Sequence, residues 1–113
     1  ILKLEDIIHM TKTNLKANHI KIENLFKSMF SEVQNTSIDL KDDRVEIMHL
    51  DEENQDSANI ELYETKSGYI ISYWDGYSLS ENEESGDLIK ALKIFKRYAK
   101  KMAKNLKKFS DHI

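Results

Sequence analysis

The chain between residues 60 and 76 reads IELYETKSGYIISYWDG, and this stretch decides the fold. Apolar and polar residues alternate from 60 to 63, which is the period of a strand with one buried face. A Lys-Ser-Gly turn signal ends at Gly68, and residues 69–74 continue as a run of aromatic and β-branched side chains. The stretch therefore predicts an antiparallel hairpin in which Gly68 is free to adopt a positive φ.

Strands are also predicted on both sides of this hairpin. Residues 45–49 alternate between apolar and polar side chains, which indicates a preceding strand. Asp75-Gly76 is a two-residue turn signal, so residues 77–79 are expected to return as a short edge strand. The stretch 51–59 is polar and is expected to form a loop. The middle of the chain thus predicts an antiparallel meander of three to four strands.

A helix is predicted before the meander. Apolar residues recur there every seven positions, at Ile8, Leu15, Ile22 and Met29. With their apolar neighbours they predict helix over residues 4–34, as one long helix or as a short helix followed by a longer one. Both forms stay open because residues 11–14 are rich in side chains that compete for backbone hydrogen bonds.

A long helix is predicted after the meander. Its apolar residues step alternately by four and three, at Leu88, Leu92, Phe95, Ala99, Met102, Leu106, Phe109 and Ile113. Ser85 is expected to cap its start, and Asp87 places a carboxylate where the helix dipole favours one. The order helix, meander, helix predicts a single α+β domain over residues 1–113, with both helices packed across one face of the sheet in two layers.

Composition excludes several classes of protein. The chain has 113 residues, of which 40% are hydrophobic and 33% charged, as expected for one globular domain. It has no cysteine, and therefore no disulfide, thiolate metal site or cysteine nucleophile. No apolar run approaches the roughly 18 residues of a membrane span, and residues 1–10 do not have the pattern of a targeting peptide. We expect a cytoplasmic protein that does not bind membranes.

Charge is distributed very unevenly. The formal net charge is only −3, from 17 basic and 20 acidic residues. Residues 88–113 hold nine basic residues and one acidic residue, whereas residues 39–87 hold fifteen acidic and three basic residues. An asymmetry of this size within one domain says more about partners than about fold.

The acidic middle predicts a surface that receives a basic protein. Acidic clusters of this kind raise association rates and select the partner, and tyrosines near turns are frequent interface anchors. The candidate partner-binding residues are Asp51, Glu52, Glu53, Asp56, Tyr63, Asp75, Tyr77, Glu81, Glu83 and Glu84. The alternative is that these acidic loops are simply solvated. Neither the acidic cluster at residues 51–56 nor the one at residues 81–87 has the spacing of a calcium loop, so no metal is expected.

The basic closing helix has several interpretations. Its lysines form a solvated face that attracts the acidic sheet of the same molecule, or its heptads pair with another helix or a second copy. A third interpretation is a phosphate-contacting surface made by Lys93, Lys96, Arg97 and Lys100. The negative net charge and the single arginine of the helix argue against nucleic acid as a partner. An amphipathic helix on anionic lipid would remove the apolar stripe from the core.

No catalytic signature is present in the sequence. The four histidines lack metal-ligand spacing, and neither a G-x-S-x-G elbow nor a phosphate loop occurs. His49 and Asp51 share a strand face as a base and its orienter would, but a structural histidine at a strand end is favoured. We therefore expect no enzymatic activity, no cofactor and no small-molecule substrate.

One segment resembles a known class of proteins. Residues 69–79 read YIISYWDGYSL, acidic residues follow, and residues 87–92 read DLIKAL. This segment resembles the small immunity proteins of bacterial toxin–immunity pairs, in which a strand ends near Trp or Tyr, an acidic loop follows and a helix closes the domain. Acidic phage-encoded inhibitors, including anti-CRISPR proteins, are similar for the same reason. The resemblance implies a bacterial, single-domain inhibitor of a basic toxin or nuclease.

The sequence therefore predicts a non-enzymatic inhibitor that occludes a basic partner with its acidic surface. Two alternatives remain: a chaperone-like or structural dimer paired through the C-terminal heptads, and a nucleic-acid-binding module that uses the basic helix. The protein is accordingly expected to be a monomer or a homodimer.

Overall fold

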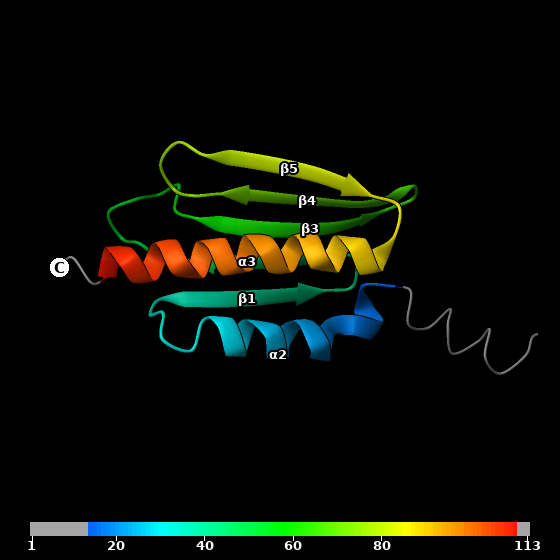
Figure 1. The fold of residues 1–113 in the computed structure, drawn as a ribbon, viewed down its shortest axis with the longest axis horizontal. Coiled ribbons are helices and arrows are strands. Elements are labelled where there is room, and N and C mark those ends of the chain that lie inside the picture. Colours follow the sequence, from blue (N-terminus) through cyan, green and yellow to red (C-terminus); the bar gives the residue numbers. More distant parts are fainter. Residues whose placement is uncertain (1–13, 111–113) are drawn as a thin grey trace, which may run out of the picture.

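The computed structural model describes residues 14–110 as a helix, five strands and a long helix (Figure 1). All neighbouring strands are antiparallel, and the sheet order β1-β2-β3-β4-β5 follows the chain. The elements are η1 (Lys16–Asn18), α2 (His19–Met29), β1 (Thr36–Lys41), β2 (Arg44–His49), β3 (Asn59–Thr65), β4 (Gly68–Trp74), β5 (Ser80–Ser85) and α3 (Leu88–Ser110). The α+β class and the order helix, meander, helix are confirmed, but the predicted count of three to four strands is wrong.

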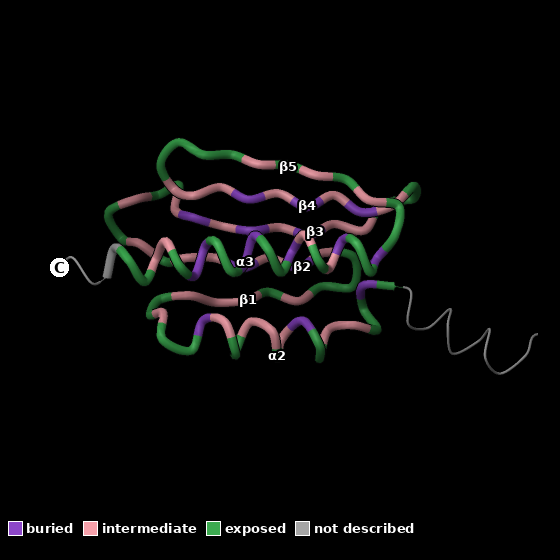
Figure 2. Tube along the Cα trace, viewed as in Figure 1, coloured by how far each residue is buried: buried purple, intermediate pink, exposed green. Residues whose placement is uncertain are grey.

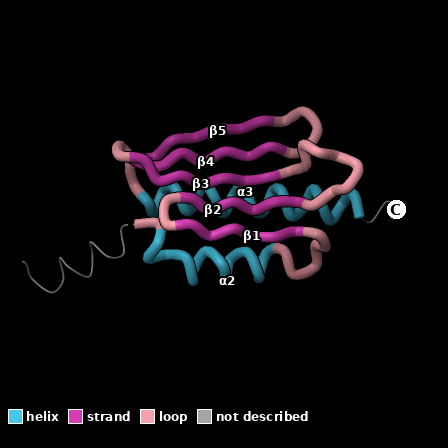
Figure 3. The backbone as a smooth tube through the Cα atoms, turned by 180° about the vertical axis from the view of Figure 1, so that it is seen from behind, coloured by secondary structure: helices cyan, strands magenta, loops and turns pink. Residues whose placement is uncertain are grey.

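Helix α3 covers one face of the sheet, and no element of the described residues 14–110 covers the other, which we call the open face (Figures 1 and 3). Helix α2 runs beside β1, where the ring Nε2 of His19 is 2.8 Å from the carbonyl oxygen of Lys41. Ile22 of α2 is buried, and the helix also contacts α3. The predicted contact between the two helices is therefore present.

The apolar stripe of α3 packs on the sheet of the same chain. Phe95, Ala99 and Met102 are fully buried, and buried segments recur along α3 (purple in Figure 2). The register brings Val45, Leu62 and Ile71 of successive strands into one row beneath them, also fully buried. The two-residue period of the strands and the heptad of the helix thus meet in one core.

Strand β1 was not predicted. Only Ile38 and Leu40 supply apolar side chains in this short strand, and both are half-buried because β1 is an edge strand of the sheet. The predicted helix to residue 34 instead ends at Met29, and Asn35 takes a φ of 61° just before the strand. Residues 4–13 of the predicted helix lie outside the described residues.

The turns agree with the sequence in one place and differ in another. Gly68 follows the predicted turn with a φ of 150°, and a Cβ there would lie 2.6 Å from the carbonyl oxygen of Ser85. Residues 77–79, predicted as an edge strand, belong to a loop. The fifth strand is instead built from Ser80–Ser85, a stretch that the sequence predicts as an acidic loop.

The cap of α3 is Asp87 rather than the predicted Ser85. The backbone N–H of Ile89 donates to Oδ1 of Asp87 at 3.1 Å, which satisfies one open donor of the first turn. Ser85 orders the residue before the helix instead, since its Oγ accepts the backbone N–H of Asp87 at 3.2 Å. Among residues 14–110, no helix combines the length and the apolar character needed to cross a bilayer.

Truncation of the central aromatic residue of α3 tests this core. Phe95→Ala removes a fully buried ring between helix and sheet, and we expect a loss of about 3–5 kcal/mol in the free energy of unfolding. Ile89→Ala, at a position 65% exposed on the same helix, is the control and should change it by less than about 0.5 kcal/mol. Urea denaturation followed by circular dichroism measures both; similar losses would contradict the packing described.

Candidate partner-binding surface

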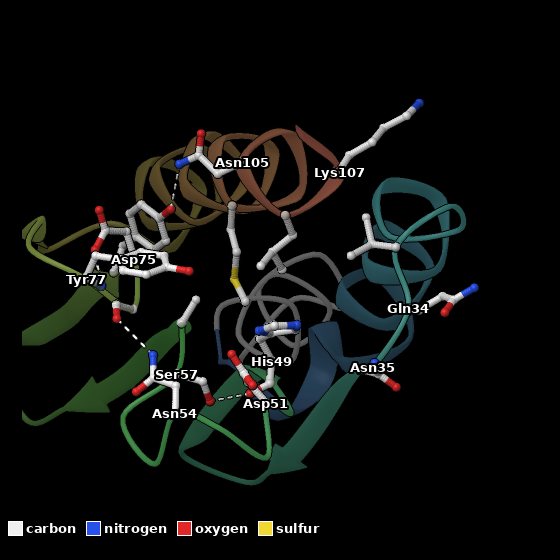
Figure 4. Close-up of a pocket in the computed structure, with 16 residues that line it drawn as sticks. Gln34, Asn35, His49, Asp51, Asn54, Ser57, Asp75, Tyr77, Asn105 and Lys107 are labelled. Atoms are coloured by element: carbon white, nitrogen blue, oxygen red, sulfur yellow. Dashed lines mark hydrogen bonds between the residues drawn. The ribbon is translucent and has the colours of Figure 1, made fainter. Parts of the chain in front are cut away.

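Two loops meet at one end of the sheet: residues 50–58 between β2 and β3, and residues 75–79 between β4 and β5. Nδ2 of Asn54 donates to the carbonyl oxygen of Gly76 at 2.9 Å (Figure 4). Nε1 of Trp74 donates to the carbonyl oxygen of Asp56 at 2.8 Å. Gly76 has a φ of 92°, and a Cβ there would lie 3.2 Å from the backbone nitrogen of Ala58. The two loops therefore hold each other in place, and we call them together the loop-end surface.

Asp75 fixes the shape of the second loop. Its Oδ1 accepts the backbone N–H groups of Tyr77, Ser78 and Leu79 at 2.8, 2.9 and 3.0 Å. Burial disfavours the charged carboxylate, but these three hydrogen bonds, together with one from the backbone of Asp75 itself, outweigh it and hold the pKa of Asp75 below its ordinary value. The negative charge of Asp75 is thus used mainly to order its own loop.

A cavity of about 460 Å³ opens between these loops, residues 33–35 and the C-terminal half of α3 (Figure 4). Met102, Leu106 and Ala58 are among its apolar lining residues. Its polar lining includes His49, Asp51, Asn54, Asp75, Tyr77, Asn105 and Lys107. The size and the mixed lining suit a side chain presented by another molecule.

Several polar groups of the cavity wall are hydrogen-bonded within the protein. Nδ2 of Asn105 donates to the hydroxyl of Tyr73 at 3.2 Å, and burial raises the pKa of Tyr73. Oγ of Ser57 donates to the carbonyl oxygen of His49, and the carboxylate of Asp51 accepts the N–H of Glu53 at 3.0 Å. These contacts order the cavity wall. Separately, residues 14–110 contain no group of three His, Cys, Asp or Glu side chains able to hold a metal ion.

The loop-end surface concentrates exposed apolar side chains. Of the five large hydrophobic residues that are exposed in the described chain, three belong to it: Leu50 at 61%, Tyr77 at 66% and Leu79 at 36%. The other two, Ile20 and Ile89, lie on the helices. Exposed aromatic and apolar residues next to a cavity are typical of the centre of a protein interface.

Four carboxylates of the loop 50–58 belong to the same surface and have no ion-pair partner among residues 14–110. They are Asp51, Glu52, Glu53 and Asp56. Six of the ten predicted partner-binding residues, these four with Asp75 and Tyr77, are therefore brought together at one end of the molecule. The prediction missed Leu50, Leu79, Asn54 and Asn105, and only Leu50, an apolar residue directly before the acidic run, gave a signal in the sequence.

Two predicted residues are instead engaged inside the molecule. Glu81 and Glu83 lie on the face of β5 that α3 covers, where Lys101 is 3.0 Å from Glu81 and Arg97 pairs with Glu83. The hydroxyl of Tyr98 donates to Glu83 at 2.8 Å. Burial, followed by the hydrogen bond and the charge of Glu83, raises the pKa of Tyr98 to about 12. This is the attraction between basic helix and acidic sheet that the sequence left open as an alternative.

The remaining two, Tyr63 and Glu84, lie on the open face of the sheet. Tyr63 is half-buried, with the guanidinium of Arg44 5.2 Å from its ring centroid. The same guanidinium lies 3.0 Å from Glu46 and 3.2 Å from Glu61, which stand opposite each other on β2 and β3. Burial and the nearby charge of Glu61 raise the pKa of Glu46. The carboxylates at the centre of this face are thus paired locally.

Removal of the Asp75 carboxylate tests the bracing of the loop. Asp75→Ala should lower the free energy of unfolding by about 1–2 kcal/mol at pH 7, because three N–H groups lose their acceptor. Since the pKa of Asp75 is lowered on folding, its contribution is present above the ordinary carboxyl pKa of about 4. The difference in the free energy of unfolding between wild type and Asp75→Ala should therefore become smaller as the pH falls from about 4 towards 2.

Asp75→Asn is the matched control. This substitution removes the negative charge but keeps an amide oxygen that can accept the hydrogen bonds. Urea denaturation at each pH measures all three proteins. Equal stability of the alanine variant and the wild type at pH 7 would contradict the role assigned to this side chain.

Comparison with known proteins gives no relative from which a role could be transferred. No family model matches the chain, and neither the curated proteins nor the solved structures contain a match. Any function must therefore be argued from the chemistry of the surfaces described above.

Proposed function

We propose that this chain is a non-enzymatic, immunity-like inhibitor that binds a basic protein, such as a toxin or a nucleic-acid enzyme, through its loop-end surface. The partner would be held in a stoichiometric complex that occludes its active or nucleic-acid-binding site. This proposal narrows the contact predicted from sequence to the loops 50–58 and 75–79, because Glu81 and Glu83 already have basic partners in the protein.

The observation that carries the proposal is the exposure of Tyr77 on a loop that is already ordered. The residue is 66% exposed, although the loop around it is fixed by three hydrogen bonds to Asp75. A side chain on a backbone that is already ordered before binding brings a smaller cost in conformational entropy than one on a mobile loop. Tyrosines of this kind, beside a cavity that a partner side chain can fill, are typical binding hot spots.

The four unpaired carboxylates supply the second requirement, which is selection of a cationic partner. Carboxylates around an apolar centre steer a basic protein towards it and repel acidic proteins. Because they lie in an exposed loop, we expect them to affect the association rate and its salt dependence more than the dissociation rate.

The dimer alternative has no comparable support. The heptad residues Phe95, Ala99 and Met102 are fully buried against the sheet, so this stripe is already covered within one chain. Pairing through it would require α3 to leave the sheet.

Truncation of Tyr77 tests the proposal against the product of the neighbouring open reading frame, purified as a separate protein. Tyr77→Ala should weaken the complex by about 30-fold, equivalent to about 2 kcal/mol, because a central aromatic anchor is lost. Ile89→Ala, at a similarly exposed position on α3, should change the affinity less than about threefold. Isothermal titration calorimetry gives both affinities and the stoichiometry.

Neutralisation of the acidic loop provides a second, independent test. The triple variant Glu52→Gln, Glu53→Gln, Asp56→Asn should lower the association rate about tenfold at low salt. The control Asp39→Asn, Asp42→Asn, Asp43→Asn changes net charge equally at other exposed positions and should have a much smaller effect. Absence of any salt-sensitive one-to-one complex, or equal effects of the two triple variants, would overturn the proposal.

A further inference from the structure

Helix α3 carries many more basic residues than are paired with carboxylates of the described chain. Between Leu88 and Ser110 it has nine basic residues and no acidic one. Three of the nine pair with carboxylates elsewhere: Arg97 with Glu83, Lys101 with Glu81 and Lys107 with Glu32. The other six are exposed and have no acidic partner among residues 14–110: Lys90, Lys93, Lys96, Lys100, Lys104 and Lys108. We call these six the outer lysine row.

The row is continuous and lies on one side of the helix. Successive members are three or four residues apart, so each is a neighbour of the next on the helix surface. At about 1.5 Å and 100° per residue, the row extends over about 27 Å and within about 120° of arc. The same geometry places it on the side opposite Phe95 and Met102, which the sheet covers.

This arrangement opposes the stability of the helix. Like charges three or four residues apart destabilise a helix by about 0.2–0.5 kcal/mol for each pair, and exposed helices commonly avoid this by alternating Glu with Lys. Lys96, Lys100 and Lys104 follow each other at spacings of four with no carboxylate between them on α3. Because no intramolecular contact within the described chain compensates the repulsion, an external polyanion is the natural source of compensation.

We propose that the outer lysine row binds the phosphate backbone of nucleic acid independently of sequence. Its length of about 27 Å matches the rise of about eight base pairs, along which phosphates recur at every step. The row contains only lysines, which neutralise phosphates as point charges and lack the fork that reads guanine. This contact lies on the helix side of the molecule and does not depend on the function proposed for the loop-end surface.

The net charge of −3 does not oppose this contact, although at the sequence level it argued against nucleic acid. What a polyanion meets is the local charge, and Glu81, Glu83 and Glu32, which pair with α3, are already neutralised. Arg97, one of the four residues first assigned to phosphate contact, is committed to Glu83, whereas Lys93, Lys96 and Lys100 remain available.

An anionic membrane fits the same face less well. Helices that lie on bilayers insert an apolar face between the headgroups, but that face of α3 is buried on the sheet. On the described part of α3, Ile89 is the one large apolar residue that is exposed. The row therefore offers charge alone, as a phosphate-backbone contact requires.

The test measures binding of the full chain to a fluorescent duplex of about 20 base pairs by anisotropy, from about 50 to 200 mM salt. We expect log affinity to fall linearly with log salt, and two duplexes of unrelated sequence to bind within about threefold of each other. Lys96→Gln, Lys100→Gln, Lys104→Gln should reduce the slope by about 2.5 and the affinity at low salt by at least tenfold.

Lys16→Gln, Lys41→Gln, Lys66→Gln is the matched control, with the same change in net charge at exposed positions away from the outer lysine row. This control variant should retain most of the slope of log affinity against log salt. Thermal melting checks that both variants fold. No binding at about 50 mM salt, or equal losses in the two triple variants, would overturn the proposal. Tight binding to phosphatidylglycerol vesicles without binding to the duplex would overturn it in favour of a lipid surface.

Discussion

The contact between the apolar stripe of α3 and one face of the meander is the constraint on which the rest of the structure depends. The sheet buries Val45, Ile47, Ile60, Leu62 and Ile71 completely, yet no helix of the described part of the chain covers its opposite face. A single long helix must therefore close most of the core, and it does so with Phe95, Tyr98, Ala99 and Met102. Small residues among large ones let the helix approach the strands closely.

That contact also determines which charges are used inside the molecule and which remain outside. Once the stripe faces the sheet, Arg97 and Lys101 come beside β5, and they neutralise Glu83 and Glu81. The same orientation turns the remaining lysines outward, whereas the acidic loop 51–56 lies at the end of the sheet because it joins β2 to β3. A net charge of −3 therefore arises from two separate charged surfaces, each only partly compensated by the contacts between β5 and α3.

The elements with a strong period could be predicted from the sequence, and those decided by tertiary contacts could not. Residues 45–49, 60–63 and 69–74 alternate cleanly, and the stripe from Leu88 to Leu106 is sustained over many turns. Strand β5 reads SENEES, which has neither apolar residues nor β-branched ones. It forms because β4 offers it a hydrogen-bonding edge and α3 offers cations to its glutamates.

The candidate site shows the same division. The acidic run and Tyr77 stand out in the sequence, but the cavity between them depends on Asn54 reaching Gly76 and on Asn105 reaching Tyr73, contacts that span 22 and 32 residues. No local pattern signals such pairs. Nor does composition tell that Glu81 and Glu83 are paired while Glu52 and Glu53 are not.

The chain-order topology has a consequence for how the protein is made. Every strand pairs with the one synthesised just before it, so the meander can form hairpin by hairpin with short loops to close. Helix α3 follows all five strands, and until it leaves the ribosome the row of Val45, Leu62 and Ile71 has no cover. Until α3 docks, a sheet formed from the five strands therefore exposes this apolar row, so the docking of α3, rather than the closure of the first hairpin, is the step at which aggregation competes with folding.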